Sequence, residues 1–558
     1  MTGGGKKQGL QVLDDDTGLG LILPNHMGDW AMLKLKKESL EWALSLAINN
    51  GDTDIFPTAF EFEAILHDAQ ITAPGYKSII DEISEKNILD WKTRPFRSCL
   101  IPKHQYGFRV STQLDPLDFL VYTALIYELA PDIESRRVHA TENIVHSYRF
   151  RPTGNSMFDP YYNYSTFRRR SQELANTDRF SHVVVADIAD FFPRLYRHRV
   201  ENALKACTTK TSHVTALDGM LNQWTEHYSY GIPVGPTASR LIAEISLDDV
   251  DRLLLSEGMI FVRFSDDYRI FCSSAKEAYE KLAFLANAIF SNHGLTFQQS
   301  KTKIVTLEAF KAGYLLSEEA QEFKRLSERF YEILDETDID HYEIIEWDDL
   351  TETQQDQLKE LNLVGIIEEQ VKSEEIDIGI CKFVLRRLSQ LGNDQALDIL
   401  IDNIDRLYPV FPDVVRYVTS IRLSDVNLKK DIGNRMLELL SDTTVSHLEY
   451  HRMWLLNMFT YSTEWNNQGE FVRLFNEATD DFSKRELILA LGRSRQDYWF
   501  RARKVNLFQQ FTDWSRRAFL AAASCLPTDE RKHWYHSLES RLDRLEIAVI
   551  RWARQNPF

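Results

Sequence analysis

The chain has 558 residues, of which 44% are hydrophobic and 12% aromatic, and its net charge is −18. This composition excludes a wholly disordered protein, and the length predicts two to four domains. The acidic balance is unexpected for a protein that binds nucleic acid through its phosphates. No apolar run approaches the ~18 residues of a membrane span, and the N-terminus lacks the apolar core of a signal peptide. We therefore expect a soluble cytoplasmic protein without membrane contact.

Charge is distributed unevenly along the chain. Residues 92–109 and 149–170 are locally basic, whereas residues 335–379 are strongly acidic. Charge runs of this kind usually form solvated faces, and we assign that role to the acidic one. The five cysteines lie far apart and form no CxxC pair, which argues against a zinc knuckle and against a disulfide framework.

The expected elements change character along the chain. Residues 33–87 show helical periodicity, as in ESLEWALSLAINN. From residue 90 to 320, β-rich runs such as HVVVADIADFF and MIFVRFSDDYRIF interleave with helical ones, which predicts an α+β domain. Beyond this region the β signals nearly vanish, and helical segments follow one another to the end of the sequence.

The C-terminal helical segments contain an internal repeat. RMWLLNMF, RELILALG and RAFLAAAS begin at Arg452, Arg485 and Arg517, so they are spaced by 33 and 32 residues, and a weaker fourth copy begins at Glu546. This spacing is the period of a two-helix repeat unit. It favours an all-α, HEAT-like repeat array with a long concave binding surface over an irregular helical bundle.

Two acidic motifs in the α+β region point to chemistry. An apolar strand ends at Asp187, and Asp266 and Asp267 lie together in an apolar, aromatic run. Ser-Asp-Asp is also good turn chemistry, so the second motif alone favours a simple hairpin tip. Facing each other at a sheet edge, however, Asp187 and Asp266 would hold two divalent cations ~4 Å apart for in-line phosphoryl transfer. Such hard oxygen ligands suit Mg²⁺, with Mn²⁺ as an alternative ion.

Several motifs in a fixed order carry a resemblance to the reverse transcriptases. Asp187 to Phe192 resembles the first metal-binding strand of that family, Gly231 to Ser239 its template–nucleotide loop, and Phe264 to Asp267 its YxDD hairpin. Residues 294–302 resemble the fourth motif, and HSYRFRP from His146 resembles the element before the palm. The resemblance implies a multidomain protein in which α+β fingers and palm, as in right-hand polymerases, precede the helical repeats.

The resemblance also implies roles for individual residues. Asp187 and Asp266 would bind both metal ions and Asp267 would support the site, while Lys301 would protonate or neutralise the leaving pyrophosphate. Phe192 would exclude a ribose 2′-OH. The full set that we nominate is catalytic Asp187, Asp266, Asp267 and Lys301; substrate-binding Lys103, Arg109, Phe192, Gly235 and Ser239; and metal-binding Asp187, Ile188, Asp266 and Asp267. For Lys103, Arg109 and Lys301 the alternative is an ordinary solvated side chain.

The chain departs from the family at two positions. Val234 stands where the family has a glutamine that touches the incoming nucleotide, and Phe264 stands where it has a tyrosine. Both changes remove polar contacts from the pairing site and leave the metal-binding carboxylates intact. The departures therefore predict a competent polymerase whose template-directed fidelity is reduced.

GIPVGPTASRLIAE and the C-terminal helices resemble one branch in particular, the abortive-infection, defence-associated reverse transcriptases of bacteria (AbiK-like and Abi-P2-like). This implies an antiphage, homo-oligomeric enzyme that uses dNTPs. In some members of that branch the DNA product is made without a template and is linked to a protein tyrosine. RNA is a further expected partner, and the phage trigger or host target is not identified. The alternatives are a conventional RNA-templated reverse transcriptase of a retroelement and a non-catalytic scaffold.

The resemblance divides the chain into five parts. In order, these are a mobile N-terminus (1–30), a helical N-terminal region with the fingers (31–180), the palm (181–320), an acidic helical linker or thumb substitute (321–375) and the helical-repeat domain (376–558).

Overall fold

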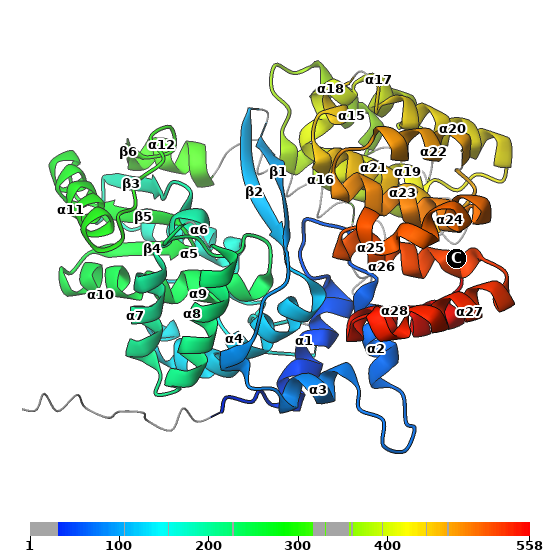
Figure 1. Ribbon diagram of the computed structural model, residues 1–558. Coiled ribbons are helices and arrows are strands. Elements are labelled where there is room, and N and C mark those ends of the chain that lie inside the picture. Colours follow the sequence, from blue (N-terminus) through cyan, green and yellow to red (C-terminus); the bar gives the residue numbers. More distant parts are fainter. Residues whose placement is uncertain are drawn as a thin grey trace, which may run out of the picture.

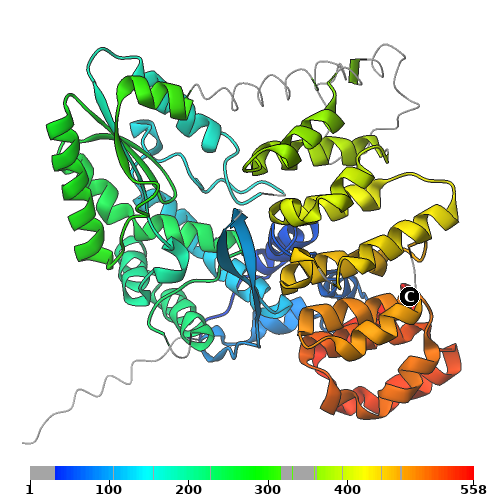
Figure 2. The same cartoon turned by 90° about the horizontal axis from the view of Figure 1, so that it is seen from above.

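The computed structural model describes residues 32–315 and 361–558, except 105, 155, 226, 227, 393, 442, 466 and 467, and also residues 330, 357 and 358. The expected mobile N-terminus and most of the expected acidic linker lie outside the described residues. An α/β part and an array of helices lie on opposite sides of a two-stranded β-hairpin (Figures 1 and 2). None of the described helices is long and apolar enough to cross a membrane.

The N-terminal part is mainly helical and surrounds one buried helix, α4 (Pro116–Arg136). Asp115 caps this helix by accepting a hydrogen bond from the Leu117 N–H, and Pro116 occupies the first turn, where no N–H is needed. Because α4 packs against helices on several sides, most of its residues are buried. The other elements here are α1 (Lys37–Asn50), α2 (Glu61–Ala69), α3 (Ile79–Glu85), β1 (Arg97–His104), β2 (Gly107–Gln113) and α5 (Tyr164–Ala175).

A four-stranded antiparallel sheet with strand order β4-β5-β3-β6 forms the centre of the α/β part. Its strands are β3 (His182–Asp187), β4 (Ile260–Phe264), β5 (Asp267–Cys272) and β6 (Lys303–Thr306). Val183 and Val185 pack into one hydrophobic cluster, and Val184 and Ala186 pack into another. Because both faces of β3 are covered, its sequence is a nearly continuous apolar run.

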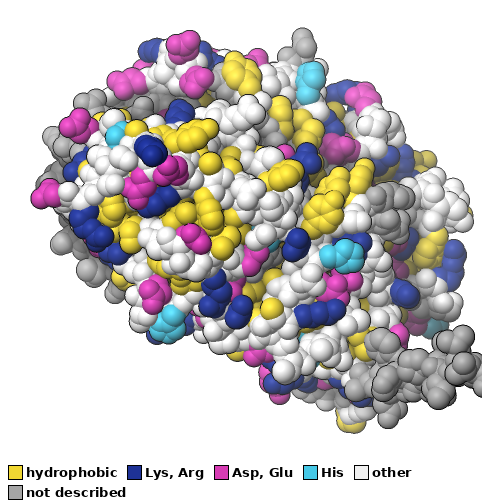
Figure 3. Space-filling view, turned by 90° about the vertical axis from the view of Figure 1, so that its left-hand side faces the viewer, with side chains coloured by type: hydrophobic (Ala, Val, Ile, Leu, Met, Phe, Trp, Pro, Cys, Tyr) yellow, Lys and Arg dark blue, Asp and Glu magenta, His cyan; other side chains and the backbone are white. Residues whose placement is uncertain are grey.

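Helices cover both faces of this sheet. α5 and α12 lie on one side and α9 and α11 contribute to the core on the other. α11 ends where Gly294 adopts a left-handed conformation with φ 65°. On the outer face near α11, acidic and basic side chains are interspersed with hydrophobic ones (Figure 3). The helices are α6 (Phe191–Arg194), α7 (Arg197–Cys207), α8 (Thr211–Trp224), α9 (Thr237–Ser246), α10 (Asp248–Ser256), α11 (Ala275–His293) and α12 (Leu307–Phe310), followed by a π-helix (Lys311–Leu315).

The described residues after 360 are helical, and the four segments aligned in the sequence form consecutive layers. α21 packs against α23, α23 against α26, and α26 against α28. A Cβ atom added at Gly492 in α23 would lie 2.5 Å from the Ala522 Cβ in α26, so glycine permits this close approach. The array comprises α15 (Leu363–Lys372), α16 (Ile378–Leu391), α17 (Leu397–Asp402), α18 (Ile404–Leu407), α19 (Phe411–Ser420), α20 (Val426–Glu438), α21 (Glu449–Tyr461), α22 (Gln468–Glu477), α23 (Asp481–Arg493), α24 (Asp497–Arg503), α25 (Leu507–Gln510), α26 (Asp513–Ala522), α27 (Thr528–Leu538) and α28 (Arg544–Gln555).

Buried ion pairs connect the N-terminal part to this array. Glu61 of α2 accepts two hydrogen bonds from Arg485, at 2.7 and 2.9 Å, and one from the Arg517 Nε at 2.9 Å. Arg517 also lies 2.9 Å from Asp115 at the start of α4. All four side chains are at most 3% exposed. The N-terminal part and the array are therefore joined through charges that solvent does not reach.

Glu61 makes a testable contribution to acid stability. Burial raises its pKa, but the Arg485 and Arg517 charges outweigh burial and lower the pKa to about 2. A depressed carboxyl pKa adds stability that is fully present above the unfolded pKa of ~4.3 and is lost as pH falls toward the folded value, by ~3 kcal/mol in total. We expect the difference in unfolding free energy between wild type and Glu61→Gln, measured in urea, to shrink from pH 5 to pH 3. A difference that stays constant over this range would contradict the assignment.

Candidate active site

The two acidic motifs meet at one edge of the four-stranded sheet. β4 and β5 are joined by a two-residue turn, Ser265 and Asp266, and Ser265 has φ 54°. Asp187, the last residue of β3, pairs directly with Asp267, the first residue of β5. The Ile188 N–H donates to the Asp266 carbonyl at 3.2 Å. The strand end and the hairpin tip therefore lie side by side, which is the adjacency that the sequence predicts.

These carboxylates lie where positive charge would be favourable. Burial raises the pKa of Asp266, the charge of Asp187 raises it further, and Lys103 and Lys301 oppose this rise. Burial, followed by the charges of Asp266 and Asp187, raises the pKa of Asp267 to about 6. Like charges gathered in a poorly hydrated site repel one another unless a cation joins them.

The oxygen atoms available at this edge fit Mg²⁺ bound through only a few protein ligands. Asp187 and Asp266 offer hard carboxylate oxygens, and Ile188, whose side chain is in the core, can offer only its backbone carbonyl. Among the described residues, no three His, Cys, Asp or Glu side chains form a group that could hold a metal by themselves. Mg²⁺ commonly takes one or two carboxylates and completes its shell with water and substrate phosphates.

Lys301 lies at the same edge. Its Nζ donates to Asp187 Oδ2 at 2.9 Å, and its side chain is 47% exposed. Burial lowers the pKa of Lys301, but the hydrogen bond to Asp187 and its charge outweigh burial and raise it. The Gln298 N–H donates to the Asp187 carbonyl at 2.8 Å, which fixes the loop that carries Lys301 next to β3. The structure thus brings Lys301 to the aspartates.

The two nominated basic residues of the β1–β2 hairpin point to different places. Lys103 is exposed and close enough to the acidic edge for its charge to lower the pKa of Asp266. Arg109 pairs across the hairpin with Ile101, and both line a cleft of about 1320 Å³ between the hairpin and the C-terminal helices. The register shift between Pro102 and His104 separates the two sides. In this conformation Lys103 lies within charge range of Asp266, whereas Arg109 lines the cleft beside the helical array.

This geometry gives a paired prediction. Lys103→Ala is expected to raise the KM for dNTPs by about tenfold, which corresponds to losing one hydrogen bond to a charged group. Arg109→Ala is expected to leave the same KM within about twofold of wild type, because its side chain points away from the aspartates. Steady-state dNTP incorporation by the two variants measures both values. Equal increases in KM would show that Arg109 also reaches the triphosphate.

Gly235 and Phe192 belong to a loop that contacts the β1–β2 hairpin and to the turn after β3. Gly235 has φ 138°, and a Cβ there would lie 2.9 Å from the Thr112 carbonyl of β2, so this loop passes close to the hairpin. The Thr112 N–H donates to the Val234 carbonyl at 2.8 Å. Phe192 is half-buried, and its carbonyl accepts a hydrogen bond from the Ile232 N–H of the same loop.

Ser239 differs from the expectation of a residue that contacts the nucleotide. It is fully buried, and its Oγ lies 2.9 Å from the Tyr122 hydroxyl of α4. Ser239 therefore joins α9 to α4 in the protein interior and does not face a ligand. A serine on the buried face of an amphipathic helix cannot be distinguished by sequence from one that faces a pocket.

A buried ionic cluster beneath the hairpin turn was not found from the sequence. Arg263 of β4 binds Asp251 with two nitrogens, at 2.5 and 2.8 Å, and lies 3.1 Å from Glu244. Arg137 donates to the same Glu244 at 2.6 Å. The Ser147 Oγ, from the segment HSYRFRP, donates to Glu244 at 2.6 Å.

This cluster holds the turn directly. Arg263 Nη1 donates to the Ser265 carbonyl at 2.8 Å, and the Ser265 N–H donates to Ser147 Oγ, also at 2.8 Å. Ser265 has an unfavourable left-handed conformation, so these two bonds stabilise the turn that presents Asp266. A signal was present in the sequence: an arginine within an apolar strand and a glutamate within the apolar face of α9.

Aromatic rings surround Phe264, the residue before the turn. Its ring centroid lies 5.4 Å from that of Tyr164, 5.7 Å from that of Tyr148 and 5.9 Å from that of Phe167. The Phe264 ring is therefore packed among other rings, and it offers no hydroxyl at the end of the hairpin.

Comparison with known proteins agrees with this geometry. Residues 101–360 match a family model described as "Reverse transcriptase (RNA-dependent DNA polymerase)". No curated protein matches the chain. Two solved structures are telomerase from Candida albicans in complex with a TWJ fragment of telomeric RNA and apo telomerase from Candida tropicalis. Each is 10% identical in sequence. The Candida albicans structure covers 69% of this chain and 67% of its own chain, with a TM-score of 0.30. The Candida tropicalis structure covers 82% of this chain and 68% of its own chain, with a TM-score of 0.28.

The family match includes β3, the β4–β5 hairpin and the loop of Lys301, that is, every element that contributes to the acidic edge. Residues 101–360 are therefore similar to the reverse transcriptases, a family of nucleotidyl-transferring polymerases.

Proposed function

We propose that the protein is an antiphage, reverse-transcriptase-like DNA polymerase that adds dNTPs by two-metal phosphoryl transfer, without a template and from a protein primer. The observation that carries the polymerase assignment is the meeting of Asp187 with the Asp266-Asp267 hairpin inside the segment that matches the reverse transcriptases. The antiphage role rests on the resemblance of the sequence to the abortive-infection branch.

Five of the nominated residues have a defined task in nucleotidyl transfer in this proposal. Asp187 and Asp266 hold the cations, which would supply the charge for in-line displacement at the α-phosphate. Asp267 of β5 pairs with Asp187 of β3, and this pairing keeps the Asp187 carboxylate at the sheet edge. Lys301, already bonded to Asp187, neutralises charge on the departing pyrophosphate, and Lys103 binds the triphosphate from the hairpin side.

Weakened template dependence is supported by two features of the pairing site. Val234 offers no polar side chain beside β2, and Phe264 is packed among aromatic rings. Hydrogen bonds to the nucleotide pair discriminate strongly, because a wrong partner leaves a buried polar group unpaired. In an apolar pairing site no polar group is left unpaired, so a wrong nucleotide does not incur this penalty. The HEAT-like array and a homo-oligomer complete the proposal, supported by the repeat and by the stacking of α21, α23, α26 and α28.

Phe192 is proposed to exclude ribonucleotides. Its carbonyl is bonded to the loop of Gly231 to Ser239, and its ring is half-buried five positions after Asp187. Phe192→Ala should raise the efficiency of rNTP incorporation relative to dNTP incorporation about 100-fold, since a steric clash of a few kcal/mol would be removed. Competition between labelled dATP and ATP measures the ratio. An unchanged ratio would mean that another residue excludes the 2′-OH.

The proposed function is tested with the purified full chain, Mg²⁺ and labelled dNTPs, with and without RNA template. A product that forms without template and changes mobility after protease treatment is the expected result. Strict dependence on RNA would instead support a conventional retroelement reverse transcriptase. Wild-type protein as inert as Asp266→Ala would support a non-catalytic scaffold. Mass spectrometry of the protease-treated product would identify the attachment residue.

A further inference from the structure

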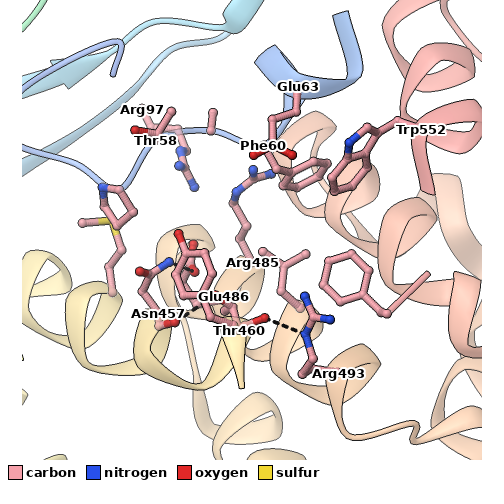
Figure 4. Close-up of a pocket in the computed structure, with 16 residues that line it drawn as sticks. Thr58, Phe60, Glu63, Arg97, Asn457, Thr460, Arg485, Glu486, Arg493 and Trp552 are labelled. Atoms are coloured by element: carbon pink, nitrogen blue, oxygen red, sulfur yellow. Dashed lines mark hydrogen bonds between the residues drawn. The ribbon is translucent and has the colours of Figure 1, made fainter. Parts of the chain in front are cut away.

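A second polar cavity lies far from the acidic edge, where the N-terminal part meets the helical array. It has a volume of about 190 Å³ and is lined by residues 57–60, the start of β1, and helices α21, α23 and α28. Figure 4 shows the Arg97 and Arg485 guanidinium groups facing this space, with Asn457 and Glu486 opposite them. None of these side chains takes part in the proposed nucleotidyl transfer.

Arg97 is the unusual member of the lining. It is only 8% exposed, and its guanidinium lies between the rings of Phe482 and Trp514, at 4.2 and 4.0 Å from their centroids. Its Nη2 donates to Gln113 at 2.6 Å. Its Nε and Nη1 have no hydrogen-bond partner, and none of the described carboxylates forms an ion pair with it.

A buried cation without an anion is energetically costly. Buried charges in proteins are normally paired and fully hydrogen-bonded. The neighbouring Arg485 does not compensate Arg97, since its two terminal nitrogens are already bonded to Glu61 and it carries the same charge. Burial and this second arginine lower the pKa of Arg97 to about 10, and the charges of Asp481, Glu486 and Glu61 oppose this shift. Glu63 and Glu486 also line the cavity, so an added anion would be held by the unpaired N–H groups of Arg97 and not by a general excess of positive charge.

The opposite wall can orient a small ligand. Asn457 donates to Glu486 at 2.9 Å, and the Arg493 Nε donates to the Thr460 carbonyl at 2.9 Å. Phe60 and Trp552 stack at 5.4 Å and close one side with apolar surface. A cavity of this size accepts a phosphate or carboxylate group with a few attached atoms, but not a polymer.

We propose that this cavity is a binding site for a small oxyanion, a phosphate or carboxylate group held by the free N–H groups of Arg97. The bound anion would connect the base of the β1–β2 hairpin to α21 and α23, the helices beneath it. Lys103 lies on the same strand as Arg97, so occupancy of the cavity would fix the base of the strand that carries it. The site does not depend on the proposed polymerase activity and is tested without it.

The test is thermal unfolding of the full chain in increasing inorganic phosphate, with sodium chloride at matched ionic strength as reference and sodium acetate as a second anion. A saturable rise of about 2 °C in phosphate beyond that in chloride is expected, because a ligand that binds only the folded state raises its stability. A rise in acetate alone would assign the site to carboxylates. No saturable rise in either anion overturns the proposal.

Variants locate the site. Arg97→Met should abolish the anion-dependent rise, whereas Arg501→Met, on the exposed helix α24 outside the cavity, should retain it. If Arg97→Met does not fold, Leu489→Phe fills the cavity, leaves Arg97 in place and should also abolish the rise. A rise that persists in the cavity-filled protein shows that phosphate binds elsewhere.

Discussion

Replacing Asp266 with asparagine is expected to lower dNTP incorporation at least about 1,000-fold, because the proposed cations would lose a ligand worth several kcal/mol of charge stabilisation and each ~1.4 kcal/mol is tenfold in rate. The same change should leave the thermal unfolding midpoint unchanged or slightly raised. Asp266 is half-buried beside Asp187, and these like charges repel each other in the folded protein. Single-turnover incorporation and calorimetry measure the two effects.

Asp190→Asn is the matched control for this prediction. Asp190 follows β3 by three residues, but its side chain is 69% exposed and pairs loosely with Arg194 at 3.6 Å. It should keep near wild-type activity. If Asp266→Asn kept its activity, or if Asp190→Asn lost as much, the acidic edge would be assigned to the wrong residues.

Arg263→Met is expected to destabilise the protein by about 3–5 kcal/mol, because it leaves buried carboxylates without their cation. Asp251 has both oxygens bonded to Arg263, and Glu244 keeps only Arg137 as a charged partner. Urea unfolding measures the loss. Arg269→Met on the neighbouring strand is the matched control, since Arg269 is equally buried but contacts the Phe167 ring and the Ser171 hydroxyl. It should cost less than half as much.

A second change separates stability from catalysis. Adding Asp251→Asn to Arg263→Met removes the uncompensated charge and should recover at least about 1 kcal/mol. It cannot restore the bond from Arg263 to the Ser265 carbonyl, so kcat should remain low. Recovery of kcat together with stability would show that the cluster supports only the fold and does not position the turn.

Local sequence pattern was enough to predict the sheet that carries the acidic edge. An apolar β-branched run ending in Asp187 and a Ser-Asp-Asp turn between β-rich flanks determine strand, hairpin and edge within a few residues of each carboxylate. The spacing of the helical segments was visible for a similar reason, and the helices that contain them pack against one another in chain order. These features depend on short-range periodicity.

The rest depended on contacts between distant segments. Whether Arg109 faces the aspartates depends on the register shift near Pro102, and a shift by one residue exchanges the two faces of a strand. Glu61, in an ordinary amphipathic helix, gave no sign that it meets arginines more than 400 residues away. Arg97 was one of several basic residues in the locally basic stretch 92–109. Their surroundings exist only in the folded chain.

The ion pairs of Glu61 and Arg517 have an implication for how the molecule can be divided. A chain cut before α15 would retain Glu61 and Asp115 at a newly exposed apolar surface, and the array alone would retain Arg485 and Arg517 in the complementary position. Neither half is then a self-sufficient unit, although each has its own hydrophobic cluster. The helical array is thus a structural component of the part that carries the acidic edge, and exchanging it for another module would require its partner surface to change with it.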